Sequence, residues 1–341
     1  MAEVAFRSPL PTPRSLEPSE NNGRSLMSNL TPLAEGAEFE KIRRIWSTLG
    51  DRAVGGGDDC AIVQLGGETL AISSDMVVEG VHFRAGWLEP AELGWRMAAA
   101  ALSDLAAVAA QPQGVLVSLA VSPEWPDELV AELMSGVGSV AASVGAVVWG
   151  GDVVRGDKLT GDVVVVGRVD EPLLRTGAKA GDALFVSGSL GGPGAAIRSW
   201  EAGEQPEQTA RQRFAHPEPR VAEAIWLSER GATALIDLSD GLAQDASQLA
   251  AASGVRCVID VDSVPRHPAV DDPTMALVSG EEFELLVTLQ VDPDNDIMAR
   301  FERQHGLELT RIGTIGPGAG VSLQRGGQPI ELPSGFRHFY R

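Results

Sequence analysis

Aspartate residues recur beside glycine or serine at the edges of apolar segments, and they are the side chains of this chain best suited to chemistry. A carboxylate at the end of a buried strand is unfavourable unless it is paired or bound to a metal ion. Several short carboxylates that converge make an oxygen cage for Mg²⁺. A single Asp-Gly or Ser-Asp pair is more often an ordinary turn or cap, but the repetition favours a metal site. The five places are Gly57-Asp58-Asp59, Ser73-Ser74-Asp75, Ser103-Asp104, Gly150-Gly151-Asp152 and Asp237-Leu238-Ser239-Asp240-Gly241.

The charge balance excludes one large class of phosphate-binding proteins. The 341 residues include 47 acidic and 27 basic side chains, so the formal net charge is −20. A protein that neutralises nucleic-acid phosphates with its own side chains needs the opposite balance, so we expect no nucleic-acid partner. An acidic protein still binds phosphorylated ligands when divalent cations mediate the contact. Because only three lysines are present, arginine or metal must bind most anionic groups.

Two further features fit a phosphorylated ligand. The Gly-rich run from Gly188 to Gly194 follows a predicted strand and precedes a predicted helix, so its backbone N–H groups can hold a phosphate at a helix N-terminus. Such a turn is also common for structural reasons alone. Arg175 lies at a predicted domain junction and can pair with a polyphosphate, although a surface salt bridge is the commoner fate of a lone arginine.

Signatures of several other enzyme classes are absent from the sequence. It contains no GxxxxGK[ST] phosphate loop, no HExxH zinc helix and no GxSxG nucleophile motif, and its five histidines do not cluster at metal-ligand spacing. Cys60 and Cys257 are too few and too far apart in sequence for a disulfide framework or a CxxC metal pair, which favours a reducing, cytoplasmic setting. The uncharged apolar stretch at residues 136–151 is rich in glycine and shorter than a membrane span, so we expect no membrane partner.

The elements that must position the aspartates can be predicted from the apolar periodicity. The apolar runs at 147–149 and 163–166 are too apolar for strands exposed on both faces. The polar region 202–215 carries no assignable pattern. We expect helices near residues 39–49, 90–110, 127–144, 195–200, 219–229 and 242–252, and strands near 61–65, 70–73, 115–121, 147–149, 163–166, 184–187, 234–237, 255–261, 283–289 and 311–315.

Composition divides the chain into three parts. Residues 1–35 are rich in Pro, Ser and Asn, and we expect a disordered N-terminal extension there. Between residues 170 and 181 the chain becomes charged and contains Gly and Pro, which indicates a domain boundary. We therefore predict an N-terminal metal-binding domain over 36–170 and a C-terminal α/β domain with the Gly-rich loop over 171–341. Strands and helices mix in both, so the fold class is α/β, or mixed α+β.

The ordered set of motifs resembles one enzyme family. Over about residues 37–339 the chain resembles the thiamine-monophosphate kinases, which belong to a wider group of aminoimidazole-ribonucleotide-synthetase-like ATP enzymes. The resemblance implies the two-domain fold of that group, with a first domain that binds metal and ATP and pairs its sheet across a homodimer. Besides the five aspartate motifs, it rests on Gly80-Val81-His82-Phe83, Arg175-Thr176-Gly177-Ala178-Lys179, Ser279-Gly280-Glu281-Glu282-Phe283-Glu284 and Gly335-Phe336-Arg337-His338-Phe339.

The resemblance implies that ATP phosphorylates thiamine monophosphate to thiamine diphosphate, the last step of thiamine diphosphate biosynthesis, with several Mg²⁺ ions. The implied metal ligands are Asp59, Ser73, Ser74, Asp75, Asp104, Asp152, Asp237 and Asp240, of which Asp75, Asp104, Asp152 and Asp240 are expected to be catalytic. The family's ATP-binding positions correspond to Gly151, Asp152, Arg175 and Ser239, and its thiamine monophosphate positions to His82, Glu281 and Phe336.

Each of the three substrate positions also has a plain structural interpretation. On the residues alone His82 is a capping or core-edge histidine, Glu281 a solvated acid and Phe336 a core side chain. With the resemblance, His82 becomes a neutral donor beside the acceptor phosphate, Glu281 balances the cationic part of the substrate, and Phe336 stacks on a ligand ring. Glu282 stands where the family usually has aspartate, and we expect its extra methylene to shift the substrate pocket slightly.

Direct phosphoryl transfer is the mechanism that fits these residues. The acceptor phosphate is already mostly ionised near neutral pH, so attack on the γ-phosphorus needs no strong general base. Mg²⁺ ions remove the repulsion between the two polyanions. Two other functions stay open. Aminoimidazole-ribonucleotide synthetase or selenophosphate synthetase would also use ATP and Mg²⁺, although the latter needs a reactive residue in a Gly-rich N-terminal segment that this chain lacks. The second open function is that of an inactive, acidic metal-binding protein.

Overall fold

The computed structural model describes residues 31–53, 55–290 and 296–331. The predictions on Phe336 and on residues 1–30 of the expected extension therefore lie outside the described residues. None of the helices in these ranges is long and apolar enough to cross a membrane. The α-helices are α1 Ala37–Leu49, α2 Pro90–Ala107, α3 Asp127–Ser143, α4 Gly192–Glu201, α5 Gln208–Ala215, α6 Val221–Ser228, α7 Leu242–Ser253, α8 Pro273–Val278 and α9 Ile297–His305.

The first half of the chain forms a five-stranded sheet in the order β1-β2-β5-β3-β4. β3 and β4 are parallel, with α3 between them in the chain, and the other neighbours are antiparallel. β1 pairs only with residues 68–72 of β2. Within the described residues, the rest of β2 therefore has β5 on one side and no strand on the other. The strands are β1 Ala61–Leu65, β2 Glu68–Val78, β3 Gln111–Val121, β4 Val147–Arg155 and β5 Thr160–Arg168.

One face of this sheet is covered by α2 and α3. α2 begins with a capping box, in which the Glu89 side chain accepts from the Glu92 N–H and the Glu92 side chain accepts from the Glu89 N–H. The two helices approach closely because Gly94 lies against the backbone of α3 at Leu133 and Gly136 lies against the backbone of α2 at Ala91. A Cβ on Gly94 would lie 1.8 Å from the Leu133 carbonyl oxygen, so a larger residue there would force the helices apart.

The strand β4 contradicts one prediction. Alternate residues of β5 are buried, which agrees with the apolar run at 163–166. By contrast, every residue of β4 is exposed, and Val147, Trp149, Val153 and Val154 are each more than half exposed. β4 pairs with β3 on one side only. The prediction that residues 147–149 are buried is therefore wrong for a single chain, because an edge strand needs a neighbour to cover it.

The second half forms a seven-stranded sheet in the order β12-β11-β8-β10-β6-β9-β7. α7 and α8 pack on one face, and α6 and α9 on the other. The central strands β6 and β9 are buried at every position, which explains their continuous apolar sequences. The strands are β6 Ala183–Ser187, β7 Ala232–Asp237, β8 Arg256–Asp260, β9 Leu285–Leu289, β10 Leu309–Gly316, β11 Gly320–Arg325 and β12 Gln328–Ile330.

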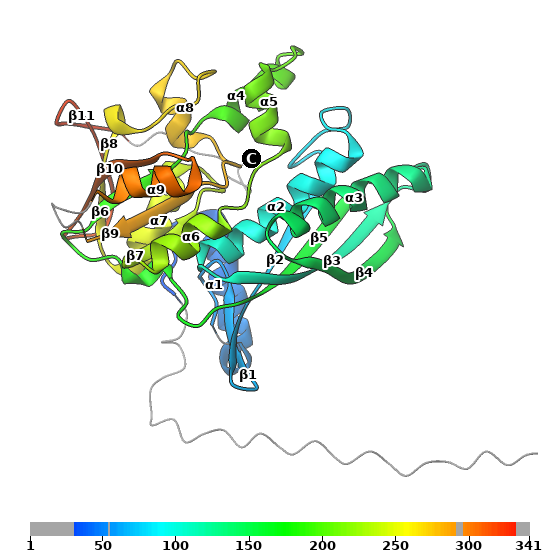
Figure 1. The fold of residues 1–341 in the computed structure, drawn as a ribbon, viewed down its shortest axis with the longest axis horizontal. Helices are drawn as coiled ribbons and strands as arrows, with labels where there is room; N and C mark the ends of the chain where they lie inside the picture. Colours follow the sequence, from blue (N-terminus) through cyan, green and yellow to red (C-terminus); the bar gives the residue numbers. More distant parts are fainter. Residues whose placement is uncertain (1–30, 54, 291–295, 332–341) are drawn as a thin grey trace, which may run out of the picture.

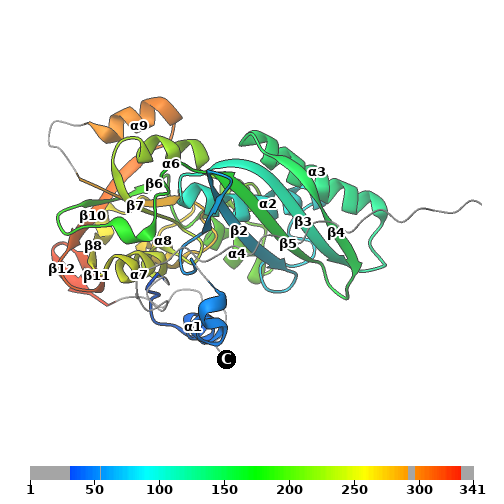
Figure 2. The ribbon, with the colours of Figure 1, turned by 90° about the horizontal axis from the view of Figure 1, so that it is seen from below.

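The helix α2 joins the two halves. It lies between the two sheets in Figure 1 and in the perpendicular view of Figure 2. It contacts β2 on one side, and α6 and β7 on the other. Small residues make this possible, since Ala98, Ala99 and Ala101 are fully buried. As a result, β2, α2 and the end of β7 meet at one place.

Several elements differ from the sequence prediction for identifiable reasons. α2 ends at Ala107 rather than Ala110, because Ala109 adopts a left-handed φ of 54° and the following Gln111 and Pro112 already belong to β3. α5 falls in the region 202–215 that had no assignable pattern. It buries few side chains, so its apolar periodicity is weak. α8, α9, β11 and β12 were also not predicted; none exceeds nine residues.

Candidate active site

Three carboxylates from distant parts of the chain meet where the two halves join. Asp59 precedes β1, Asp104 lies on α2 and Asp237 ends β7. One oxygen from each lies within 4.8 Å of the other two. The apolar cores on either side hold α2 and β7 in place. Carboxylate oxygens at this spacing suit a hard divalent cation. The three predicted ligands are therefore close enough to bind the same ion.

Arg175 is bound to this cluster. Its Nε donates to Asp59 Oδ2 at 2.9 Å and its Nη2 donates to Asp59 Oδ1, and the Arg175 side chain is only 15% exposed. Burial disfavours the charged guanidinium, but the Asp59 carboxylate outweighs burial and raises the pKa of Arg175 above its ordinary value. The surface salt bridge considered from the sequence is therefore replaced by a largely buried pair with two parallel hydrogen bonds.

Within the described part of the chain, neither Asp104 nor Asp237 forms an ion pair of this kind. Burial and then repulsion from Asp237 raise the pKa of Asp104 well above its ordinary value. Burial and Asp59 raise the pKa of Asp237 to about 8, and the same two causes raise that of Asp58 to about 6. A cluster of this kind holds protons near neutral pH unless a cation replaces them, which is the electrostatic condition expected of a metal site.

A pocket of about 210 Å³ beside the cluster collects most of the predicted site. Ser73 supports it by donating a hydrogen bond to Asp104 Oδ2 at 2.6 Å. Ser74 instead donates to Asp162 Oδ1 at 2.7 Å, since successive side chains of a strand point to opposite faces. The predicted residues that line the pocket are Ser74, Asp75, His82, Asp104, Asp237, Ser239, Asp240 and Glu281.

Local hydrogen bonds orient His82 and the turn after β7. The Val78 N–H donates to His82 Nδ1 at 2.9 Å, which places the proton of the neutral imidazole on Nε2. Asp245 accepts hydrogen bonds from the N–H groups of Asp240 and Gly241 and so shapes the turn. Asp245 was not identified from the sequence. Its signal was an acidic residue in the first turn of the predicted helix 242–252, where a carboxylate serves the free backbone N–H groups.

Arg96 is a second site residue that the sequence analysis missed. Its side chain is 2% exposed, lines the same pocket and forms an ion pair with Glu281. The guanidinium also donates to the Phe214 carbonyl and lies over the Phe214 ring, with its central carbon 3.6 Å from the ring centroid. The sequence contained the signal, because Arg96, Ala100 and Asp104 are spaced by four and share one face of α2.

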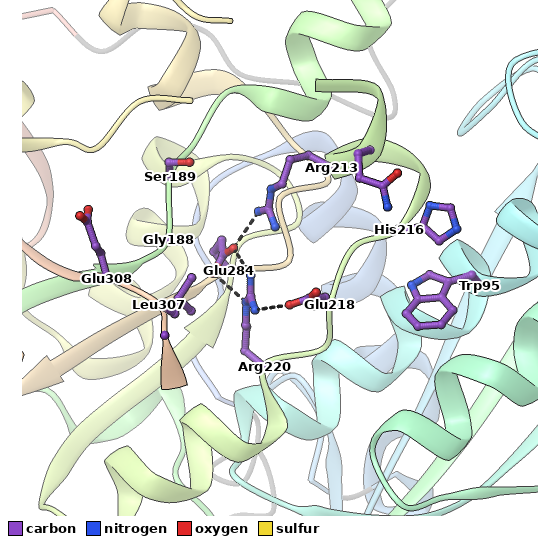
Figure 3. A pocket seen from close by; sticks show the side chains of 12 residues that line it. Trp95, Gly188, Ser189, Arg213, His216, Glu218, Arg220, Glu284, Leu307 and Glu308 are labelled. Atoms are coloured by element: carbon purple, nitrogen blue, oxygen red, sulfur yellow. Dashed lines mark hydrogen bonds and ion pairs between the residues drawn. The ribbon is translucent and has the colours of Figure 1, made fainter. Parts of the chain in front are cut away.

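The chain from Glu281 to Glu284 separates this pocket from a second cavity of about 560 Å³, shown in Figure 3. Glu281 and Phe283 line the first pocket with left-handed φ angles of 65° and 51°. Glu284 faces the second cavity, where it accepts hydrogen bonds from Arg213 and Arg220 at 2.7 Å. Non-glycine residues keep such backbone angles only where their surroundings impose them. Here the Glu281 N–H donates to the Ser239 carbonyl at 2.7 Å and the Phe283 N–H donates to the Leu238 carbonyl at 2.8 Å, so the turn after β7 holds the segment.

The Gly-rich loop after β6 binds an anion from within the chain. The Gly191 N–H donates to Glu282 Oε1 at 2.6 Å, and the Gly194 N–H donates to Ser279 Oγ at 3.0 Å. The prediction that this loop holds a phosphate is therefore corrected, because the Glu282 carboxylate occupies the N-terminus of α4. Burial raises the pKa of Glu282 to about 7.

Gly151 and Asp152 lie apart from the other predicted residues. They are on β4, which β3 and β5 separate from β2. At the usual spacing between strands this separation is roughly 14 Å. The Asp152 carboxylate accepts a hydrogen bond from the Val153 N–H. A single chain therefore does not bring Asp152 to Asp75, and Phe336 lies outside the described residues.

Family models match most of the patterned chain. Residues 57–169 match the N-terminal domain of AIR synthase related proteins, and residues 179–326 match the C-terminal domain. The thiamine-monophosphate kinase of Pyrococcus horikoshii is 31% identical over 301 residues, which cover 87% of this chain and 94% of that protein. The thiamine-monophosphate kinase of Aquifex aeolicus is 30% identical over 320 residues, which cover 90% of this chain and 99% of that protein.

Solved structures agree with these matches. A structure described as AaThiL complexed with AMPPCP and TMP has a TM-score of 0.78 and 29% identity, and the match covers 89% of this chain and 97% of that one. The thiamine-monophosphate kinase of Stenotrophomonas maltophilia has a TM-score of 0.72 and 32% identity, with 86% and 98% coverage. The predicted two-domain, mixed α/β fold is confirmed. On these matches and on the motifs in its pocket, the chain belongs to the thiamine-monophosphate kinase family of AIR synthase related proteins.

Proposed function

We propose that this chain catalyses the ATP-dependent phosphorylation of thiamine monophosphate to thiamine diphosphate. The observation that carries the proposal is the cluster of Asp59, Asp104 and Asp237 within 4.8 Å, beside a pocket that also contains Asp75 and His82. Relatives that match the chain over most of its length are kinases for this substrate, and one structural neighbour is a complex with AMPPCP and TMP. ATP is the phosphoryl donor and thiamine monophosphate the acceptor.

The donor atoms of the cluster fit Mg²⁺. The carboxylate oxygens of Asp59, Asp104 and Asp237 lie at a spacing that a hard cation prefers. The raised pKa values of Asp104 and Asp237 mean that their ionised forms are unfavourable without a cation beside them. Together with Asp75 and Asp240, these carboxylates would hold several Mg²⁺ ions. When bound, these ions neutralise the donor and acceptor phosphates and stabilise charge on the transferring group.

The chain's own residues position the substrates rather than activate a nucleophile. The acceptor phosphate is mostly ionised near neutral pH, so its oxygen attacks the γ-phosphorus in line without a general base. His82, with its proton on Nε2, donates to the acceptor phosphate. Arg175 and Ser239 contact the nucleotide. Transfer is direct, with no phosphorylated enzyme intermediate.

ADP release from Mg·ATP, measured with and without thiamine monophosphate, tests the proposed reaction while chromatography follows thiamine diphosphate. We expect one ADP for each thiamine diphosphate, and no labelled protein after incubation with γ-labelled ATP. ATP hydrolysis without thiamine diphosphate would assign the site to another substrate. Absence of any ATP chemistry would leave an acidic metal-binding protein.

We infer further that the enzyme is a homodimer in which β4 of one copy pairs with β2 of the other. β4 is exposed throughout, and Met76 and Leu116 on the uncovered face of the same sheet are also exposed. Beyond Ile72, β2 has a free edge in the described structure. Exposed apolar edges of this kind favour strand pairing with another chain.

This pairing would complete the metal site. The strand registers place Asp152 in one cross-strand row with Ser118, Asp162 and Met76. Asp152 therefore lies at the same level of the sheet as the part of β2 that carries Asp75. If β4 of a second copy lies beside β2 with the two strands at the same level, its Asp152 would reach the pocket of the first copy. The partner then supplies the ligand that a single chain holds roughly 14 Å away.

Mixing two inactive variants tests this arrangement. Light scattering should give twice the chain mass of 35.8 kDa. Asp104→Asn and Asp152→Asn should each be inactive as homodimers. A heterodimer of the two has one intact site, so an equal mixture that has exchanged subunits should recover about a quarter of the wild-type activity. Recovery fails if Asp152 acts within its own chain.

Two remaining sequence predictions stand as proposals. The first is the division into a metal- and ATP-binding domain over 36–170 and a second domain over 171–341. The second is a cytoplasmic location, which is supported by Cys60 and Cys257 because both are free and buried.

A further inference from the structure

Arg96 and Glu281 form an ion pair in the candidate pocket. The two side chains differ in their exposure and in how firmly other contacts hold them. The Arg96 side chain is 2% exposed and the Glu281 side chain 28%. Arg96 keeps two other contacts, the Phe214 carbonyl and the face of the Phe214 ring, so its position does not depend on Glu281. Glu281 is the more exposed residue of the pair, and its backbone has a left-handed φ angle. The Glu281 side chain is therefore the one that can rotate away from its partner.

The charges around the pocket make Arg96 distinctive. Among the described residues that line it, carboxylates predominate and Arg96 alone carries a permanent positive charge. Burial lowers the pKa of Arg96 to about 9 and the nearby Asp75 opposes this shift, so the guanidinium is charged at neutral pH. A buried guanidinium without a partner is strongly unfavourable. Any ligand group that takes the place of Glu281 must therefore be anionic.

We propose that Arg96 binds the phosphate monoester of the acceptor, which inserts into this ion pair. The cationic heterocycle then pairs with Glu281, the role that the family resemblance already implies for that residue. The inference rests on the proposed function, which gives the acceptor both charges: thiamine monophosphate carries a phosphate at one end and a thiazolium ring. The zwitterion replaces one ion pair by two, so no buried charge is left alone. Because Arg96, Asp104 and Asp237 line the same pocket, the bound phosphate sits beside the carboxylate cluster.

The same exchange selects the phosphorylated acceptor. Thiamine has the cation without the phosphate, so it would draw Glu281 away and leave Arg96 buried and unpaired. Inorganic phosphate would pair with Arg96 and leave Glu281, which is partly exposed, to water. We expect the site to disfavour thiamine relative to thiamine monophosphate by about 100-fold on this account.

Steady-state kinetics of Arg96→Gln and Arg96→Lys test the exchange, with Arg211→Gln as the matched control. Arg211 forms an ion pair with Glu92 and does not line the pocket. In Arg96→Gln we expect the KM for thiamine monophosphate to rise about 100-fold and the KM for ATP to stay within about twofold. Thiamine should become a tighter competitive inhibitor, because the variant releases Glu281. Arg96→Lys should restore most of the affinity for thiamine monophosphate.

Glu281→Gln provides the opposite perturbation and decides the question if Arg96→Gln does not fold. Inorganic phosphate should inhibit Glu281→Gln more strongly than wild type, and thiamine more weakly. A merely structural pair would change both KM values together and would not strengthen inhibition by either probe. With an active wild type, that result overturns the exchange and leaves the proposed function intact. A wild type that forms no thiamine diphosphate refutes both.

Discussion

Replacing Asp104 with asparagine is expected to abolish activity while making the metal-free protein more stable. The nearest oxygens of Asp104 and Asp237 lie within 4.8 Å, and two ionised carboxylates at that distance would repel by about 3 kcal/mol at an effective dielectric constant of about 20. Near neutral pH the metal-free protein relieves part of this repulsion by keeping a proton on the pair, and taking up that proton also costs stability. The relief in the variant is of the same order. Asp59, by contrast, is balanced by Arg175. The asparagine keeps an oxygen that can accept from the Ser73 hydroxyl. The variant therefore loses the repulsion and little of the packing.

Thermal unfolding and product formation measure the two effects separately. In EDTA, relief of about 3 kcal/mol should raise the unfolding midpoint of a chain of this length by about 4 °C. Mg²⁺ should stabilise the wild type and have little effect on the variant, and formation of thiamine diphosphate should fall at least ~100-fold. Asp51→Asn, at an exposed aspartate outside the pocket, is the control. An Asp104→Asn protein that is less stable than wild type in EDTA, or that Mg²⁺ stabilises equally well, would refute the electrostatic reasoning.

Two further predictions concern the acids behind the substrate segment. Burial raises the pKa of Glu282 from 4.5 to about 7, so the folded chain holds a proton that the unfolded chain releases, and this contribution to stability is lost as pH rises between those values. The glutamine in Glu282→Gln stays neutral, so the free energy of unfolding of this variant, measured in urea, should rise relative to wild type by about 3 kcal/mol between about pH 4.5 and 8. The same pH dependence in both proteins would contradict this. Glu284→Gln removes the carboxylate shared by Arg213 and Arg220 and should lower the free energy of unfolding by about 3–5 kcal/mol. A loss under about 1 kcal/mol would show that water replaces the carboxylate.

Elements whose signals are local could be predicted from the sequence. The long helices near 90–110 and 127–144 were found because their apolar periodicity extends over several turns. The end of α2 was placed three residues late because the Gln111-Pro112 pair looked like the stop signal, whereas the left-handed Ala109 ends the helix earlier. Short elements such as β12 and α8 bury too few residues to produce a readable pattern.

The candidate site also contains residues that the sequence could identify and residues that it could not. The aspartates were identifiable because each short acid follows its own apolar element, but their convergence depends on sheet topology. Arg96 and Glu281 are 185 residues apart in the chain, so no local pattern connects them. The Gly-rich loop shows the opposite error: its sequence indicated a phosphate at a helix N-terminus, and only the fold shows that the side chain of Glu282, 91 residues from Gly191, takes that place.

The strand β4 shows that burial inferred from sequence can describe an assembly rather than one chain. Its apolar residues predicted a core strand, yet all of them are exposed in a single copy. Asp152, on the same strand, was predicted from the resemblance to be a metal ligand but lies apart from the cluster. The proposed dimer would account for both facts, since a second copy paired along β2 would cover the apolar edge and would bring its Asp152 to Asp75. Recovery of activity in the mixed Asp104→Asn and Asp152→Asn dimer would require this arrangement. If the mixture stays inactive, Asp152 does not act across the interface and the apolarity of β4 has another cause.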